Sequence, residues 1–487
     1  METKWDLEQN IKSTKQKIAT LKIKPIKMVT QTFLQQMNIV GDAIIELLTS
    51  AHKHSLLRPI FEDFIAEPKS WLIPIEDVVT HKQTLLLPYL EECACTDGNA
   101  FNRYKNDRRE QIENSIIQFA QNRFNKTSPT TINYLSLGSG YLLQDFFIIV
   151  KLMLEGYSVV VSLVDPIYSK SVRANQALKQ FEFLMLAATE MNLSVTIRSF
   201  PNIEEFNRSV NTPQDLVTAI DFDDIYGAFN DLMLAQESLH SKGRMFLACK
   251  DENYIFSKDK CIQSPALDNN ANILDNLPLT QKNALNIAIL SPTNFNVMPI
   301  ISSLLIPYLS NHNTVKTINL VIPQGLVINE SFGSRLNISK NALTNFMNLF
   351  LPIEINIEYI AGNVDFITLL SQYHDEQDLV ICSNQNMNGS KAILEDISKL
   401  HEKFPQANLY CGMQGYQKRG TTNIPSMTFN CQWIWNSLQQ SIKIFKYDNE
   451  LTKALITQHY KNNHPKEQFS IEMEKCFTES SKSSQTQ

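Results

Sequence analysis

Two glycines and one aspartate stand at the spacing of a nucleotide-cofactor site. Gly138 and Gly140 end the apolar run 134–137, and Asp165 follows Gly140 by 25 positions. Glycine reaches positive φ at little steric cost, so backbone N–H groups at such a turn can approach a ligand closely. An acid at the end of the next strand is placed to bind the two hydroxyls of an adenosine ribose. Together the three residues predict a turn that binds a nucleotide cofactor.

The elements around these residues must hold them in place, and their composition predicts a strand, a helix and a second strand. Residues 141–156 have helical length and are apolar on nearly every face, with Gly156 as a stop signal. Residues 158–164 form a continuous β-branched run, which is typical of a strand covered on both faces in a parallel sheet. Asp165 then lies at the carboxyl end of that strand.

This order resembles the class I S-adenosylmethionine-dependent methyltransferase family over about residues 130–260. In that family an apolar strand ends in a GxGxG turn and an acid ends the next strand. Gly138 and Gly140 match the first two glycines of the turn. The resemblance implies that Gly138, Ser139, Gly140 and Asp165 bind S-adenosylmethionine.

Two residues that follow the glycines modify this expectation. Leu142 stands where the family has its third glycine, a departure that would narrow the turn or move the methionine end of the cofactor. Asp145 falls in the first turn of the helix, where a carboxylate suits the helix dipole but opposes an anionic ligand. We therefore expect the turn to favour the sulfonium cation of S-adenosylmethionine over the diphosphate of NAD or of a sugar nucleotide.

Three carboxylates after the fourth strand are the candidate catalytic groups, at the edge where open α/β sheets bind ligands. In one interpretation Asp221 or Asp223 is a general base, while Phe222 or Tyr226 packs on adenine or substrate. In a second, the Asp-x-Asp pair binds Mg²⁺ or Mn²⁺. In a third, Asp223 or Asp224 only caps the next helix. We take Asp221, Asp223 and Tyr226 as catalytic candidates and Phe222 as a cofactor contact, with no metal site.

The strand pattern repeats in the second half of the chain. The matching pairs of stretches are 132–137 with 285–290, 159–164 with 317–322, 191–198 with 353–360, 214–217 with 377–380, and the strand ending at Cys249 with 407–411. The offset rises from 153 (285 against 132) to 163 (379 against 216), as loop insertions in a duplicated domain would produce. Two α/β domains that merely share this rhythm are the alternative.

The second copy lacks the residues that carry the predicted chemistry. Its turn has Pro292 among residues 291–294 and no glycine, and proline has no N–H to donate. Pro323 and Gln324 stand where the first copy has its acid. We therefore expect a degenerate copy that serves as a lid, a partner surface or a dimer interface.

The whole chain of 487 residues is expected to be an α/β protein with an N-terminal helical region and two tandem Rossmann-like parallel-sheet domains. The expected boundaries are a helical cap at 1–125, the sheet domains at 126–265 and 280–445, and a helical or disordered tail at 446–487. Within the cap we expect a solvated helix in 1–27 and further helices at 30–51, 59–65, 81–92 and 106–124.

Composition restricts the partners and the location. A net charge of −6, from 44 basic and 50 acidic residues, argues against nucleic acid as the main partner. The eight cysteines lack the paired CxxC spacing of structural zinc sites, although Cys93 and Cys95 are worth testing. Apolar stretches fall short of the ~20 residues that span a bilayer, and no signal peptide is seen, so we expect a soluble, cytoplasmic protein.

The polar tail from Lys466 resembles the glutamate-rich carboxy-terminal signals of effectors that bacteria export into host cells through type IV systems, with an ordinary disordered tail as the alternative. The leading function is methyl transfer from S-adenosylmethionine to a protein or small-molecule acceptor. Two alternatives stay open: a metal-dependent glycosyltransferase that uses Asp221 and Asp223, and a non-catalytic interaction protein on a decayed methyltransferase fold. The acceptor and the oligomeric state are not specified by the sequence.

Overall fold

The computed structural model contains two compact units, Met1–Ser264 and Pro265–Gln487. The structure describes residues 4–20, 31–73, 84–85, 90–91, 103, 107–124, 130–220, 228–249, 252–264, 273–277, 282–290, 300–311, 315–324, 338–361, 376–384, 402–419, 422–439 and 441–447.

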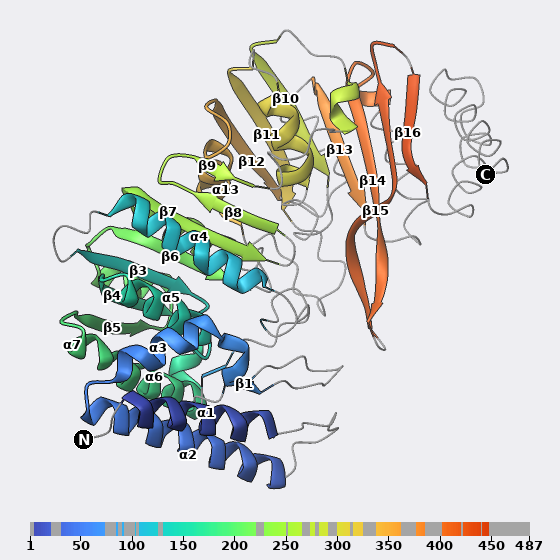
Figure 1. Ribbon diagram of the computed structural model, residues 1–487. Helices are drawn as coiled ribbons and strands as arrows, with labels where there is room; N and C mark the ends of the chain where they lie inside the picture. The colour runs from blue at the N-terminus through green and yellow to red at the C-terminus, as the bar shows by residue number, and fades with distance from the viewer. Residues whose placement is uncertain are drawn as a thin grey trace. The chain divides into compact units, whose positions relative to one another are not determined.

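The first unit is built on a seven-stranded sheet in the order β5-β4-β3-β6-β7-β8-β9 (Figure 1). The strands from β5 to β7 in this order run parallel, while β8 and β9 pair antiparallel. The strand bounds are β3 Thr131–Leu137, β4 Ser158–Val164, β5 Val195–Phe200, β6 Gln214–Ile220, β7 Leu239–Cys249, β8 Glu252–Phe256 and β9 Cys261–Gln263. The order reverses between β3 and β6, and open α/β sheets bind ligands at such a switch point, beyond the carboxyl ends of the strands.

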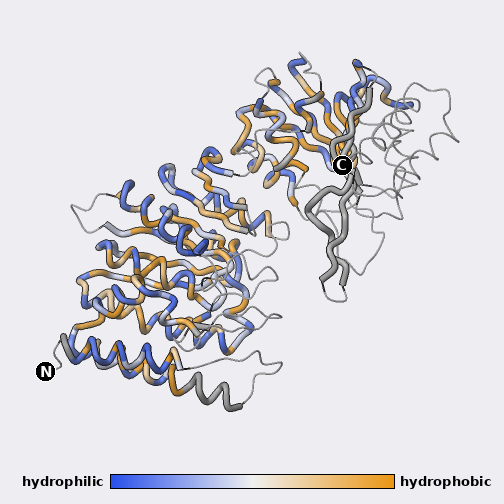
Figure 2. The backbone as a smooth tube through the Cα atoms, turned by 45° about the vertical axis from the view of Figure 1, so that its right-hand side comes forward, coloured by the Kyte–Doolittle hydropathy of each residue, from blue (hydrophilic) through white to orange (hydrophobic). Residues whose placement is uncertain are grey.

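Helices connect the parallel strands, as the alternating pattern of the sequence predicts. They are α5 Leu143–Leu154, α6 Val172–Met185, α7 Ala187–Glu190, α8 Ile203–Ser209 and α9 Phe229–Glu237. Helix α5 is buried along most of its length because its apolar residues cover nearly every side, and the buried residues include the charged Asp145 and Lys151. The central strands β3, β4 and β6 are mostly buried, which agrees with strands covered on both faces. Figure 2 shows that apolar (orange) and polar (blue) segments alternate along the backbone of this unit.

The helices that precede the first sheet are α1 Lys4–Thr20, α2 Gln31–Lys53, α3 Leu57–Ala66 and α4 Arg108–Arg123. Helix α3 packs on α5 through Phe61 and Phe64, whose ring centroids lie 6.1 and 5.8 Å from that of Phe146. Burial of one such aromatic side chain contributes roughly 1.5–3 kcal/mol. This cluster therefore joins the helical cap to the sheet in one hydrophobic core.

Two expectations for the N-terminal region are wrong. Residues 84–85 form β2, Thr84–Leu85, which pairs antiparallel with β1, Leu72–Ile73, where the sequence pattern predicts a helix. Pro88 disfavours a helix in this stretch, so pairing with β1 prevails. Helix α1 is not fully solvated either, because Leu7 and Ile18 are buried in the core of the first unit.

The second unit repeats the topology of the first, with a seven-stranded sheet in the order β12-β11-β10-β13-β14-β15-β16. The strands from β12 to β14 run parallel, and β15 and β16 return antiparallel. The strand bounds are β10 Ala284–Leu290, β11 Thr317–Gln324, β12 Glu354–Ala361, β13 Leu379–Asn384, β14 Asn408–Arg419, β15 Thr422–Asn436 and β16 Ser441–Tyr447. The helical segments are η3 Ile273–Asn276, η4 Ile301–Leu305, α12 Ile306–Ser310 and α13 Lys340–Asn348.

Both units share a hydrogen bond near the amino ends of their first and fourth strands. In the first unit the backbone N–H of Asn133 donates to Asp215 Oδ2 at 2.9 Å. In the second unit the backbone N–H of Asn286 donates to Asp378 Oδ2, also at 2.9 Å. The α/β fold with two Rossmann-like units is thus confirmed, and the shared bond agrees with a duplication, which stays a prediction.

An asparagine ladder crosses the second sheet. Asn286, Asn319 and Asn356 stand in register on β10, β11 and β12. The side-chain amide of Asn319 donates to Asn286 Oδ1 at 2.8 Å, and that of Asn356 donates to Asn319 Oδ1 at 3.2 Å. Because a slip of one residue would turn a side chain to the other face, the ladder fixes the register of these strands.

Candidate functional site

The turn after β3 holds three residues in left-handed backbone conformations. Gly138 has φ 64°, Gly140 has φ 52° and Leu142 has φ 65°, and α5 begins at the next residue. The two glycines meet the expectation that this turn needs positive φ. A leucine in the third position is unexpected, because an L-residue in this conformation costs about 1–2 kcal/mol.

Leu142 keeps the left-handed geometry at the position where the resemblance has a third glycine. Its side chain is fully buried, its N–H donates to the Ser139 carbonyl at 3.0 Å, and its carbonyl accepts the N–H of Phe146 at 2.9 Å. Leu142 directly precedes α5, and the burial of its side chain offsets the strain of its left-handed backbone. Its expected effect on binding, a narrowed turn or a displaced methionine end of the cofactor, stays a prediction.

Asp165 closes the turn from the tip of β4. Its Oδ2 accepts the N–H of Gly140 at 2.8 Å, and its Oδ1 accepts the N–H of Ile167 at 2.8 Å. The hydroxyls of Ser139 and Tyr168 lie 2.8 Å apart and link the same two segments. The structure therefore brings Gly138, Ser139, Gly140 and Asp165 together, with the acid bound to the turn itself. Each carboxylate oxygen retains a second lone pair that could accept a sugar hydroxyl.

Asp145 is buried below the turn, in the first turn of α5. It is 1% exposed, and its Oδ1 accepts the Tyr134 hydroxyl at 2.6 Å. The hydroxyl oxygens of Tyr134 and Thr218 lie 2.8 Å apart, so the polar chain continues to β6, close to its carboxyl end. Burial raises the pKa of the Asp145 carboxyl to about 6, although the hydrogen bonds from Tyr134 and Ser136 oppose this effect.

The cap also reaches the turn, through residues that the sequence did not single out. The backbone N–H of Glu91 donates to the Tyr141 carbonyl at 3.2 Å, and Glu91 forms a bridge with Leu142. The Arg173 guanidinium pairs with the Glu91 carboxylate and lies 5.3 Å from the centre of the Tyr141 ring. These residues are far apart in the sequence and have no motif spacing, so only the fold reveals them.

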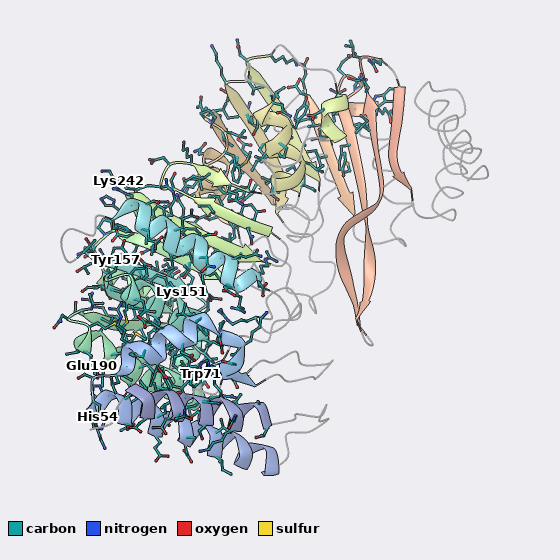
Figure 3. The ribbon with its side chains drawn as sticks, viewed as in Figure 1. His54, Trp71, Lys151, Tyr157, Glu190 and Lys242 are labelled. Carbon is teal, nitrogen blue, oxygen red and sulfur yellow. The ribbon has the colours of Figure 1, made fainter. Side chains whose placement is uncertain are left out.

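A buried network of charges positions α5 against α4. The Glu113 carboxylate pairs with Arg103 and, at 2.9 Å, with Lys151, which is labelled in Figure 3. The side chain of Gln144 donates to Glu113 at 2.6 Å and accepts from Arg109 at 2.9 Å. Burial alone would raise the pKa of Glu113, but Arg103 and Lys151 outweigh it and the pKa is lowered.

The catalytic candidates Asp221, Asp223 and Tyr226, and the predicted cofactor contact Phe222, lie outside the described residues. Strand β6 ends at Ile220, immediately before them, on the carboxyl edge of the sheet. Within the described part of the chain, no group of three or more His, Cys, Asp or Glu side chains could hold a metal ion. Cys93, Cys95, the second-copy turn 291–294 and the tail from 448 are likewise outside the description.

Three other features bear on the sequence predictions. In the second unit Pro323 and Gln324 continue β11, paired with Ile360 and Ala361 of β12, so no carboxylate stands at that strand tip. A cavity of about 730 Å³ lies between α1 and the segment 69–72 and contains none of the turn residues. No helix among the described residues is long and apolar enough to cross a membrane.

The fold and the turn define a Rossmann-like unit with a glycine turn closed by an acid. No protein-family model and no curated protein matches the chain. Among solved structures, the chain is similar to an O-methyltransferase family protein from Burkholderia thailandensis, with 11% identity, a TM-score of 0.18, and coverage of 30% of this chain and 43% of that one. The chain thus spans less than half of that protein's length.

A second similar structure is phosphoethanolamine N-methyltransferase 1 from Haemonchus contortus, in complex with phosphoethanolamine and S-adenosylhomocysteine. It is 9% identical, with a TM-score of 0.20 and coverage of 75% of this chain and 87% of that one. Likenesses at these TM-scores carry no argument for function, so the assignment depends on the site.

Proposed function

We propose that the first unit binds S-adenosylmethionine and transfers its methyl group to an acceptor that is a protein or a small molecule. The observation that carries this proposal is the closed turn, in which Gly138 and Gly140 are left-handed and Gly140 hydrogen-bonds to Asp165. This contact joins the strand-end acid to the glycine turn at the switch point of a doubly wound sheet, where nucleotide cofactors bind.

The roles of the residues follow from their places in the fold. Gly138, Ser139 and Gly140 present the turn backbone, and Asp165 offers its second lone pairs to the ribose hydroxyls. Phe222 is proposed to pack on the adenine. S-adenosylmethionine supplies an electrophilic methyl group when it is bound, and a carboxylate at the edge of the sheet can deprotonate the acceptor.

The acceptor side of the proposal depends on Asp221, Asp223 and Tyr226, which follow β6. Asp221 or Asp223 would take the proton of an acceptor hydroxyl or amine, and Tyr226 would orient the acceptor. The glycosyltransferase alternative uses the same two aspartates as Mn²⁺ ligands. It predicts Mn²⁺-dependent binding of a sugar nucleotide that is lost in Asp221→Ala.

A second candidate function, a non-catalytic interaction protein, is favoured by one observation. Both oxygens of Asp165 accept backbone N–H groups, so the acid has a structural role in holding the turn together. Cofactor binding without methyl transfer to any acceptor would favour this candidate.

The test is calorimetric titration of S-adenosylmethionine and S-adenosylhomocysteine into the protein and two variants. Asp165→Ala should abolish binding. Asp215→Ala is the matched control, because Asp215 also accepts a backbone N–H but lies near the amino end of β6. Loss of binding in both variants would point to damage of the fold, and absence of binding in the folded wild-type protein would refute the proposal.

We also propose, from the composition of the tail alone, that residues 466–487 act as a type IV secretion signal into a host cell. A reporter fused to the full chain should enter host cells, and deletion of 466–487 should prevent its entry. Equal entry of both fusions would contradict this proposal.

A further inference from the structure

Asp145 is a buried carboxylate without a cationic partner among the described residues. Its side chain is 1% exposed, and its hydrogen-bond donors are all neutral: the hydroxyls of Tyr134 and Ser136 and its own backbone N–H. Buried charges in proteins are normally paired, because desolvation of an isolated charge is unfavourable. The dipole of α5 compensates only part of a unit charge. A carboxylate in this position is therefore suited to a cation that arrives with a ligand.

Two cationic side chains near the turn form ion pairs with acids other than Asp145. Arg173, from α6, pairs with Glu91 of the cap. Lys151, further along α5, pairs with Glu113 of α4. Neither cation forms an ion pair with Asp145. The charge of Asp145 is thus available to act on a ligand held at the turn.

The remaining charged groups near this end of α5 do not neutralise Asp145. Arg109 of α4 donates to the neutral amide of Gln144, which in turn donates to Glu113. Asp165, at the tip of β4, adds a second negative charge, and the repulsion between the two acids contributes to the raised pKa of Asp145. The two acids next to the glycine turn therefore give it a negative field.

We propose, building on the function proposed above, that Asp145 determines the charge selectivity of the turn and favours the sulfonium cation of S-adenosylmethionine over the neutral thioether of S-adenosylhomocysteine. Helix N-termini ordinarily attract anions, and a carboxylate in the first turn of the helix removes this preference. A diphosphate at the same turn meets two negative charges.

This selectivity has a consequence for turnover. In methyl transfer the bond between sulfur and the methyl carbon breaks, its electron pair stays on sulfur, and a bond forms between the methyl carbon and the acceptor. The sulfonium thereby becomes a neutral thioether, and the attraction to Asp145 is lost in the same step. Asp145 thus favours entry of the charged cofactor and release of its neutral product.

The test compares the dissociation constants of S-adenosylmethionine and S-adenosylhomocysteine at pH 7.5. The wild-type protein should bind the cation more tightly. In Asp145→Asn, which keeps an acceptor for Tyr134, this preference should fall on the order of tenfold, the size of a single charge interaction in a protein site. Tyr134→Phe is the matched control, since it removes the hydrogen bond and keeps the carboxyl group. Because loss of this bond raises the pKa of Asp145 further, the control is also measured at pH 8.5, where it should keep the preference.

Each outcome bears on a different claim. If the wild-type protein binds neither compound, the proposed function fails and this inference fails with it. If both compounds bind and the ratio in Asp145→Asn equals the wild-type ratio, only the inference fails. Should Asp145→Asn not fold, the wild-type ratio decides, because equal or tighter binding of S-adenosylhomocysteine overturns the inference.

Discussion

Leu142 offers a direct test of the turn geometry. Glycine in place of alanine usually destabilises a protein, but at this position the glycine variant should be the more stable. Leu142 has φ 65° and is fully buried. Truncation of a buried leucine to alanine costs about 2–5 kcal/mol, and Leu142→Ala should fall in this range while it keeps the left-handed strain. Leu142→Gly loses the same packing but removes about 1–2 kcal/mol of backbone strain. The greater freedom of glycine in the unfolded chain costs only about 0.5–1 kcal/mol, so the glycine variant should be the more stable of the two.

The neighbouring Leu143 provides the control. It is also fully buried, but it is the first residue of α5 and has an ordinary helical backbone. There glycine should be less stable than alanine by about 0.5–1 kcal/mol. The unfolding free energy of the glycine variant minus that of the alanine variant should therefore be about 1–2 kcal/mol higher at position 142 than at position 143.

Urea unfolding of the four variants measures these differences, and melting temperatures supply a second measure, at about 2–4 °C per kcal/mol for a domain of this size. If glycine is less stable than alanine at both positions by the same margin, the left-handed conformation of Leu142 is wrong. The Leu142→Gly protein also has a glycine at the third position of the turn, so its affinity for S-adenosylmethionine shows whether the leucine weakens binding.

Three further predictions concern the charged residues. The pKa of Asp145 is raised to about 6 from its usual 3.8, so the native state binds the proton more tightly than the unfolded state. The stability that this group contributes is therefore lost as the pH rises through about 6. In urea unfolding at about pH 7, Asp145→Asn should have an unfolding free energy about 3 kcal/mol above that of the wild type. Glu113→Gln removes the buried carboxylate from Arg103 and Lys151 and should lose about 3–5 kcal/mol of unfolding free energy. Asp215→Ala and Asp378→Ala should each lose about 1–3 kcal/mol in the unfolding of their own unit, because each leaves a backbone N–H unpaired.

Specific results would contradict each of these three. A stability curve of Asp145→Asn that parallels the wild type between pH 4 and 7 would show that this carboxyl titrates normally. Because the pKa of Glu113 is lowered, its contribution should disappear in acid, and a loss in Glu113→Gln that persists below pH 3 would contradict the ion-pair explanation. An Asp215→Ala or Asp378→Ala protein as stable as the wild type would contradict the third prediction, because the unpaired N–H would then carry no cost. The loss in Asp378→Ala should be the larger of the two, since Asp378 also pairs with Lys282.

Much of the fold could be predicted because buried parallel strands have a strong signature. The β-branched run 158–164 became β4 with the same bounds, and the expected strand 285–290 became β10, Ala284–Leu290. The antiparallel strands β8 and β15 were not predicted. Strand β8 is five residues long and is specified mainly by its pairing with β7, which no local pattern records.

The site could be predicted only where one motif contains all the partners. The spacing of Gly140 and Asp165 predicted that both residues belong to one cofactor turn, and the structure brings them together there. Their direct hydrogen bond, 2.8 Å from the Gly140 nitrogen to Asp165 Oδ2, was not predicted. The bond between Tyr134 and Asp145 was not predicted, because it depends on how α5 folds back over β3. The approach of Glu91 to the turn was also missed, since it comes from the cap and has no motif of its own.

The asparagine ladder and the bond between Asn286 and Asp378 lie near the amino ends of the strands, whereas the chemistry of the fold lies at the opposite edge. The parts that hold the second sheet in register are therefore separate from the parts that a ligand would use. Substitutions at the ligand edge of this unit should therefore leave its register and its stability largely unchanged. For the same reason the second unit is a suitable scaffold for protein engineering, on which a glycine turn and a strand-end acid could be installed anew.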